Sequence, residues 1–554
     1  MIPTTLGTLL LALSVSINGE SQKQRIKPSN DSSRENANRI FNAIHSAGRQ
    51  WGSSYYHNGF SFFPAVMPKG TMLYHGASNK SVPIGPEWLA FEIEHAEGFA
   101  FSHKGKRRHG HGNPPGGKPP GDPKEPPPGE ERQELRRRRS PSPADGGDDD
   151  DNKNIRGYLH TYQAIRDLHL LYVDGMSAGK TTMGTLDTQD LLLRENTTHH
   201  DQRGFDEYPR AFDLCDIADE WGFDGVVRME AGFEVIHCDF NDGLDLISMT
   251  RTLMPEDRVG DDEMGAFMWA RAIGERYNGL AADRLQIDFS SMVSALFFPV
   301  NISSSDADRP DLVRLESARL DELKDIKSYL GGVVRQPRRF TVNWQGVVDL
   351  IVSRFAKRLA SMGLDSLSSN YFIDEVETLT ATWYDAPPLP EDMTLAARDK
   401  VNRTGDAVDR CRKHYLRPAA IIEEQWSAED ELIFTSIDTV MKNICEDVFY
   451  VRELLFEAPD STDEDNRRLQ NVVEAGRSVV HRLMEDLGWA YWKQEQPCAA
   501  DEVLVIAMWP FGYVEDHWTP GCRSIKGIQR PDGESYWRNN WGPPGGHKGD
   551  DKRG

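Results

Sequence analysis

Four segments in the first half of the chain hold the side chains best suited to chemistry. They are residues 73–76 (LYHG), 88–102 (WLAFEIEHAEGFAFS), 157–175 (GYLHTYQAIRDLHLLYVDG) and 223–240 (FDGVVRMEAGFEVIHCDF). A carboxylate held beside a sugar stabilises the positive charge that develops when a glycosidic bond breaks. Glycine lets a backbone come close to a ligand, and an aromatic ring stacks on a planar one. The four segments therefore contain the groups that glycosidic-bond cleavage would need.

The order of these segments resembles the ADP-ribosyltransferase superfamily, in the branch whose first motif carries a histidine. In that family a strand ends in a Tyr-His-Gly-like element, here Tyr74, His75 and Gly76. A helix of the form Glu-His-Ala-x-x-Phe-Ala, a strand pair and a late Asp-Gly-Val…Gly-x-Glu-x-Val strand follow in the same order. The resemblance covers residues 60–102 and 154–250. It implies an α+β, split-sheet fold and NAD as the substrate.

The resemblance also implies roles for individual residues. Glu234 would be the catalytic carboxylate beside the ribose, and His75 would hydrogen-bond the adenosine ribose. Gly76 would let the backbone approach the nicotinamide amide. The remaining contacts to NAD are expected from Tyr74 and from three aromatic rings, those of Trp88, Phe91 and Phe99.

Two features depart from the family pattern. The Ser-Thr-Ser or tyrosine of the second motif is replaced by Leu89, Ala90 and Phe91. Glu230 lies four residues before Glu234, so either acid could be the catalytic carboxylate.

Residues 174–181 (DGMSAGKT) follow an apolar run and resemble a phosphate-binding P-loop. A P-loop has four residues between its glycines, whereas three separate Gly175 from Gly179. We therefore expect a polar loop at the rim of the NAD site, where Ser177, Lys180 and Thr181 would touch the pyrophosphate.

Other common catalytic signatures are missing. The histidines at positions 109, 111, 199 and 200 have no cysteine or carboxylate frame at zinc-site spacing, so we expect no metal. Neither a Gly-x-Ser-x-Gly element nor a His-Glu-x-x-His pair occurs, which argues against common hydrolases and zinc proteases.

Hydrophobic periodicity predicts the elements that position these residues. Residues 38–50 and 211–221 read as helices, and residues 224–229 and 233–240 read as two strands joined by a Glu-Ala-Gly turn. After residue 255 the period becomes helical, with apolar stripes over residues 348–359, 433–448 and 469–487. Ser461 and Glu464 look like a capping box before the last stripe. The apolar run VLVIAMW, residues 503–509, suggests a strand.

These patterns divide the chain into five regions. An α+β, ADP-ribosyltransferase-like domain is predicted over residues 37–102 and 154–254. Residues 103–153 form an insertion rich in Pro, Gly and charge, which should be disordered and contains a possible processing site at Arg136–Arg139. A mainly α-helical domain follows over residues 255–495, and residues 496–554 form a Trp/Gly-rich tail.

The N-terminus and the cysteines indicate export. Residues 1–20 contain an apolar run, Leu6 to Val15, which suits a signal peptide and is too short to span a bilayer. The six cysteines cluster in pairs, which suggests Cys215–Cys238, Cys411–Cys445 and Cys498–Cys522, although six cysteines allow fifteen pairings. Glycosylation sequons begin at five asparagines, namely Asn30, Asn79, Asn196, Asn301 and Asn402. We expect a secreted, extracellular protein with no membrane span.

Composition narrows the choice of partners. The chain has 554 residues and a net charge of −23, and such a surface repels phosphate backbones, so nucleic acid is not an expected partner. The sequence therefore predicts a secreted NAD-binding protein that transfers ADP-ribose to a protein acceptor or hydrolyses NAD. A catalytically inactive interaction protein of the same fold is the alternative, and a secreted structural protein is a further one.

Overall fold

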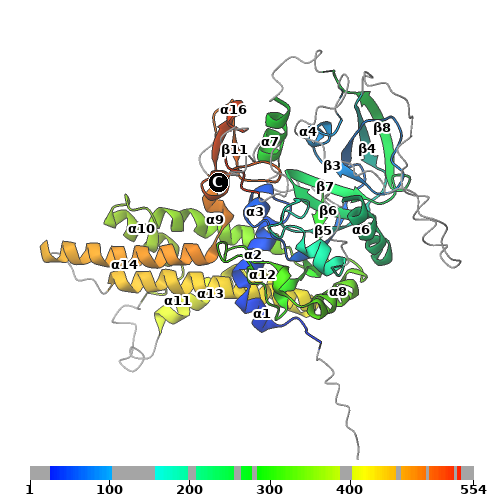
Figure 1. The fold of residues 1–554 in the computed structure, drawn as a ribbon. Helices are drawn as coiled ribbons and strands as arrows, with labels where there is room; N and C mark the ends of the chain where they lie inside the picture. Colours follow the sequence, from blue (N-terminus) through cyan, green and yellow to red (C-terminus); the bar gives the residue numbers. More distant parts are fainter. Residues whose placement is uncertain are drawn as a thin grey trace, which may run out of the picture.

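A computed structural model describes residues 25–100, 102, 156–196, 207–254, 264–276, 284–386, 402–456, 463–494, 498–528 and 533–537. The described part has mixed α and β content: a large sheet lies in the N-terminal half, and the C-terminal half is mostly helical (Figure 1). The expected signal peptide, the insertion 103–153, the Arg136–Arg139 site, Ser461 and the four loop histidines lie outside the described residues.

Among the described residues, ten strands form one sheet with the order β10-β1-β5-β6-β7-β3-β2-β4-β8, and β9 also pairs with β1. The strands are β1 Ser61–Met67, β2 Met72–Ala77, β3 Glu87–Ala90, β4 Tyr158–Ala164, β5 Leu168–Val173, β6 Gly225–Glu230, β7 Gly232–His237, β8 Leu244–Arg251, β9 Gln286–Ile287 and β10 Val293–Ser294.

The predicted pair of strands at residues 224–229 and 233–240 is confirmed, although Glu230 and Gly232 belong to the strands and the second strand ends at His237. Strands β6 and β7 are antiparallel, and Glu230 is registered with Gly232 across a turn at Ala231. Gly232 has φ of 105°, a conformation that only glycine adopts readily. A Cβ at Gly232 would also lie 2.9 Å from Nδ1 of His95. The glycine of the Glu-Ala-Gly turn is therefore required by both backbone and packing.

Two details of the expected sheet are wrong. We expected a sheet split into two parts, but strand pairing is continuous from β10 to β8. Between β2 and β3, a single registered pair, Tyr74 with Ala90, makes the connection. The sheet also extends beyond residue 254, since β9 and β10 pair with β1. Periodicity could not reveal these strands because each has only two residues.

Helices surround the sheet and build the second half. In the first part of the chain and around the sheet they are α1 Asn30–Glu35, α2 Ala37–Ser46, α3 Gln50–Tyr55, α4 Ile93–Glu97, α6 Glu207–Trp221 and α7 Met264–Arg276. In the helical half they are α8 Leu320–Val334, α9 Trp344–Met362, α10 Ser369–Thr380, α11 Arg403–His414, α12 Arg417–Ala420, α13 Ala428–Phe456 and α14 Asp463–Leu487. The three predicted stripes are confirmed as α9, α13 and α14.

The two halves share contacts. The Phe41 ring of α2 stacks on Trp489 with centroids 5.6 Å apart. The Arg49 guanidinium donates to both carboxylate oxygens of Asp349, at 2.7 and 2.6 Å. The helical half is therefore joined to the N-terminal helices by both apolar and charged contacts.

A small C-terminal module completes the chain. It contains β11 Glu502–Val505, α15 Val514–Trp518, β12 Gly521–Ser524 and α16 Ile525–Ile528, and it lies beside α7 (Figure 1). The apolar run 503–509 begins as strand β11, as predicted. The three predicted disulfides, Cys215–Cys238, Cys411–Cys445 and Cys498–Cys522, are all formed. Of the helices described, none is long and apolar enough to cross a membrane.

Candidate functional site

The strand register separates His75 from Glu234. Tyr74 is paired with Ala90, and Ala90 is paired with Glu234, so Tyr74 and Glu234 lie on one face of the sheet. Because successive strand residues point to opposite faces, His75 lies on the other. Our expectation that His75 and Glu234 flank one cleft is therefore wrong.

The His75 side chain lies in an aromatic layer. Its Nδ1 is 2.9 Å from the carbonyl oxygen of Trp88, and its ring is 5.7 Å from the ring of His160 and 6.0 Å from that of Phe240. Burial lowers the pKa of His75. These contacts give His75 a packing role on the face opposite Glu234.

The close approach at Gly76 is made by the protein itself. A Cβ at Gly76 would lie 2.0 Å from the carbonyl oxygen of Ala96 and 2.9 Å from the nitrogen of Ala100. The chain after α4 thus takes the space that the resemblance assigned to nicotinamide. Phe99 belongs to this cover and has its ring 6.1 Å from that of Trp269 in α7.

The remaining expected aromatic residues do not converge on Glu234. Trp88 is registered with Ile236, on the face of Glu234, and its ring meets Tyr208 at 5.0 Å. Phe91 is 1% exposed in the core. Tyr74 shares the face of Glu234 but is separated from it by strand β3, about 10 Å at the usual strand spacing.

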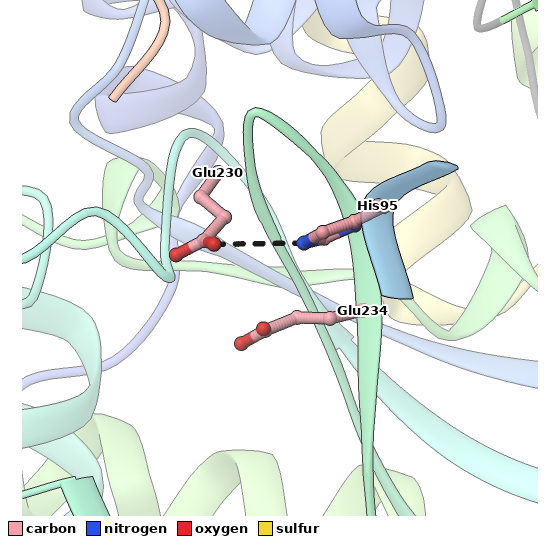
Figure 2. A group of neighbouring side chains, drawn as sticks. All are labelled: His95, Glu230 and Glu234. Atoms are coloured by element: carbon pink, nitrogen blue, oxygen red, sulfur yellow. Dashed lines mark ion pairs between the residues drawn. The ribbon is translucent and has the colours of Figure 1, made fainter. Parts of the chain in front are cut away.

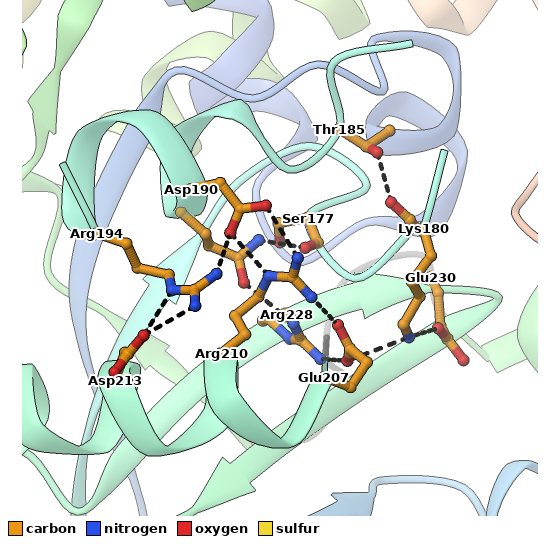
Figure 3. Close-up of polar contacts among 12 residues, drawn as sticks. Ser177, Lys180, Thr185, Asp190, Arg194, Glu207, Arg210, Asp213, Arg228 and Glu230 are labelled. Carbon is orange, nitrogen blue, oxygen red and sulfur yellow. Dashed lines mark hydrogen bonds and ion pairs between the residues drawn. The ribbon is translucent and has the colours of Figure 1, made fainter. Parts of the chain in front are cut away.

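Glu234 instead belongs to a buried network of charges. Arg228 donates from Nε and Nη2 to Oε1 of Glu234, at 3.0 and 2.6 Å. Its Nη2 also donates to Oε2 of Glu207 at 2.7 Å (Figure 3). Lys180 donates to Oε2 of Glu230 at 2.7 Å and lies 3.5 Å from Glu207. Three sequence-distant segments, the loop of Lys180, the start of α6 and the β6–β7 hairpin, therefore meet at one point.

An outer shell of ion pairs supports this centre. Arg210 donates to both oxygens of Asp190 at 2.9 Å and also contacts Glu207. Arg194 bridges Asp190 and Asp213. The side chains of Arg194 and Arg210 are 3% and 4% exposed, which means that these pairs are shielded from solvent.

The loop that carries Lys180 is fixed by its own hydrogen bonds. Ser177 Oγ donates to the carbonyl of Val173 at 2.8 Å, and the amide of Ala178 donates to the carbonyl of Met229 at 2.7 Å. Ser177 is fully buried, and Lys180 is engaged with Glu230. The expectation that Ser177 and Lys180 touch a pyrophosphate at a rim is therefore wrong, because both side chains are used inside the protein.

His95 approaches the pair from α4. Its Nε2 lies 3.6 Å from Oε1 of Glu230, and Figure 2 shows the side chain of Glu234 beside both. One ligand atom from each of His95, Glu230 and Glu234 lies within 4.8 Å of the others, so the group could hold a metal ion. The zinc-site spacing that we searched for in the sequence does not describe this group.

Each of the two central acids already binds a cation, Glu230 to Lys180 and Glu234 to Arg228. Because like charges repel, these cations disfavour a metal ion at the same carboxylates.

The pKa values of Glu230 and Glu234 are shifted in opposite directions. Burial raises the pKa of Glu234, and the charges of Glu230 and Glu207 add to this effect against Arg228 and Lys180. Burial also opposes ionisation of Glu230, but Lys180 and His95 outweigh it and lower the pKa of Glu230. Glu230 is thus the more acidic member of the pair, and Glu234 the less acidic one. A pair of carboxyl groups with separated pKa values is typical of acid–base chemistry.

A pocket of about 670 Å³ opens on the same face of the sheet. It is lined by Tyr74 and Phe91 and by three charged side chains, Glu92, Arg276 and Arg284. The two oxygens of Glu92 each accept from one arginine at 2.8 Å. Glu92 precedes α4, which carries His95 three residues later, so one turn of chain separates the pocket from the pair.

Sequence reasoning missed Arg228, Glu207 and His95 as members of the site. Arg228 did carry a signal, because an arginine within the apolar strand GVVRME must find a partner when the strand is buried. Glu207 and His95 carried none, since their separation from Glu230 in sequence says nothing about contact.

The candidate site lies in a part of the chain that is similar to known proteins. Residues 28–264 match a family model described as the YPL277C N-terminal domain. That region contains Lys180, Glu207, Arg228, Glu230 and Glu234 and ends at the first residue of α7.

Two yeast proteins are similar to the chain. The uncharacterized protein YOR389W of Saccharomyces cerevisiae is 29% identical over 563 residues, which cover 87% of this chain and 83% of that protein. The uncharacterized protein YPL277C of the same yeast is 37% identical over 243 residues, which cover 41% of this chain and 45% of that protein. No solved structure matches the chain.

Proposed function

We propose that the chain is a secreted enzyme that breaks the bond between nicotinamide and ribose in NAD and passes ADP-ribose to water or to a protein acceptor. The observation that carries this proposal is the Glu230–Glu234 pair, whose members have opposite pKa shifts within one buried network. The family resemblance of the sequence motifs supports NAD as the substrate. The three disulfides support export, because such bonds persist in oxidising compartments.

Cleavage needs a negative charge beside the ribose, but the departing nicotinamide needs no proton donor. When the ribose C1′–nitrogen bond breaks, its electron pair neutralises the pyridinium ring of nicotinamide. The ribose becomes cationic, and an ionised carboxylate beside it lowers the energy of that state. Glu230, which Lys180 holds ionised, is assigned this role. An oxygen of water or of the acceptor then bonds to C1′, and its proton passes to a carboxylate of the pair.

The pocket beside Tyr74 supports a substrate with phosphate groups. Three cations line the pocket, namely Lys69, Arg276 and Arg284. The arginines bind two acids, Glu92 and Glu94. The volume of about 670 Å³ lies within the range of small-molecule sites. We assign the diphosphate half of NAD to this pocket.

The test is release of nicotinamide from labelled NAD by the purified full chain. Glu230→Gln should lower the rate on the order of 10²-fold or more, as loss of one electrostatic contact does in other enzymes. Glu234→Gln should lower it less, because the amide resembles the protonated acid. Glu375→Gln, which breaks a comparable pair with Arg358 in the helical half, is the matched control and should keep the wild-type rate. Absence of nicotinamide release by the wild type would refute the proposal.

The alternative is a catalytically inactive interaction protein with the same fold. Its supporting observation is the burial of the pair, because Glu230 and Glu234 are only 2% and 5% exposed. For this alternative, NAD should neither be cleaved nor raise the melting temperature of the chain. If the Glu230→Gln variant binds NAD without cleaving it, the chain is an enzyme that the substitution has inactivated and not an inactive interaction protein.

A further inference from the structure

The site is covered by a turn that comes from the far end of the sequence. In the C-terminal module, the carbonyl of Trp509 accepts a hydrogen bond from the amide of Ala231 at 2.8 Å. The amide of Trp509 donates to Sδ of Met176 at 3.0 Å. Trp509 therefore touches both the turn that joins Glu230 to β7 and the loop that carries Lys180.

The indole ring of Trp509 shields the lysine of the site. Lys180 Nζ lies 4.9 Å from the centre of the Trp509 ring, within the range of a cation–π contact. The same ammonium group binds Glu230 on its other side, and its side chain is only 10% exposed. The ring therefore limits the access of water to the cation that keeps Glu230 ionised.

A second tryptophan binds the carbonyl group of the same residue, Ala231. Nε1 of Trp269 in α7 donates to the carbonyl of Ala231 at 2.8 Å, and its ring stacks on His95 with centroids 5.0 Å apart. Phe511 meets Trp269 edge-on at 5.0 Å. The turn 509–511 and α7 thus both contact Ala231, the residue that follows Glu230. The C-terminal module and α7 therefore position the acids through Ala231.

We propose that Trp509 is a positioning residue for the Glu230–Glu234 pair, so that the C-terminal module completes a site whose acids lie in the N-terminal sheet. This inference rests on the proposed function of the pair. The family model ends at residue 264, before both Trp269 and Trp509. The matched region therefore contains the charged groups but lacks the two rings that enclose them.

Removing the ring should change which protons the pair binds. Burial is the largest cause of the raised pKa of Glu234. In Trp509→Ala, water reaches the network and this pKa falls toward its usual value. The proposed step assigns the negative charge to Glu230 and the proton to Glu234, so the alkaline limb of the pH–rate profile should move to lower pH. A shift of one unit lowers the rate on that limb about tenfold, while the rate at lower pH changes much less.

The experiment compares full-length wild type with Trp509→Ala, Trp509→Phe and Trp518→Ala. Trp518 is the matched control because it belongs to the same module and contacts a cation, Arg309, but is 42% exposed. Trp509→Phe keeps an aromatic ring and should recover most of the wild-type profile. A profile of Trp509→Ala identical to that of Trp518→Ala would overturn the inference.

A second measurement does not depend on turnover. At neutral pH, the infrared band of protonated carboxylic acid should be stronger in wild type than in Glu234→Gln, and Trp509→Ala should lose most of that difference. If NAD is not cleaved but the band depends on Trp509, the proposed function fails and the positioning role stands. If NAD is cleaved and neither band nor profile responds to Trp509, the positioning role fails alone. If the alanine variant does not fold, Trp509→Leu, which fills more of the space but has no aromatic ring, supplies both readouts.

Discussion

Arg228, whose side chain is fully buried, directs two nitrogen atoms at a single oxygen of Glu234, at 3.0 and 2.6 Å. The same guanidinium reaches Glu207 at 2.7 Å and Oε1 of Gln189 at 3.1 Å. One arginine thus neutralises acids from a strand and from the start of a helix. Because Arg228 is buried and binds several partners, its loss should destabilise the network.

Replacing this arginine should destabilise the fold strongly. Arg228→Met keeps the length of the side chain but leaves Glu207 and Glu234 without their shared partner. Removing one member of a buried ion pair costs about 3–5 kcal/mol, and the free energy of unfolding in urea measures it. Arg335→Met removes an exposed pair with Glu220 and should change that free energy by no more than about 0.5 kcal/mol. Equal effects of the two substitutions would contradict the assigned role of Arg228.

His75 should be dispensable for NAD cleavage. The strand register puts its side chain on the face opposite Glu234, against His160 and Phe240. His75→Phe should therefore keep the wild-type rate of nicotinamide release per folded molecule. Loss of the hydrogen bond to Trp88 should cost on the order of 1 kcal/mol of stability. A loss of rate comparable to that of Glu230→Gln would show that His75 contributes to NAD cleavage despite lying on the opposite face.

The docking of the C-terminal module should weaken in acid. His57 Nε2 is 2.9 Å from the Tyr536 hydroxyl, and His517 stacks on the Tyr536 ring at 4.1 Å. Burial lowers the pKa of His57 to about 4 and that of His517 to about 3, against about 6.5 in the unfolded chain. Above pH 6.5 neither state binds these protons, so stability is independent of them. Below it the unfolded chain binds protons that the folded chain does not, and the free energy of unfolding falls until about pH 4 for His57 and about pH 3 for His517.

Urea unfolding at several pH values between 7.5 and 4 measures this dependence. His517→Phe keeps the stacked ring without a titrating group, so its stability should fall less steeply with acid than that of the wild type. The control is His481→Phe, at an exposed position of α14, which should keep the wild-type slope. A wild-type slope in His517→Phe would show that the stacked histidine does not link the module to pH.

The disulfide Cys498–Cys522 should stabilise this module. It bridges the start of the module to β12 across a separation of 24 residues. Closing a loop of this length contributes about 3 kcal/mol in the chain-entropy model. Replacing both cysteines by serine should therefore raise amide hydrogen exchange first in residues 502–524. The Cys411–Cys445 double variant should instead loosen α11 against α13, and unchanged exchange in both would contradict the prediction.

Short-range patterns in the sequence predicted much of the fold. The stripe that contains Val348, Ile351 and Phe355 became α9, because one apolar helix face must be buried. The turn after Glu230 was readable because glycine there permits a positive φ. The three disulfides followed from paired spacing. Strands β9 and β10 were not readable, since two residues show no periodicity.

The candidate site was predicted only in part. The sequence alone determined which chemical groups exist and that Glu230 and Glu234 lie four residues apart around a short turn. Only the tertiary structure decided that the two acids share a face, that His75 faces away, and that Lys180, Glu207 and Arg228 meet the acids while Trp509 contacts Lys180. The physical reason is that strand pairing partners and long-range charge contacts depend on how distant segments pack, and a register change of one residue moves a side chain to the other face of the sheet.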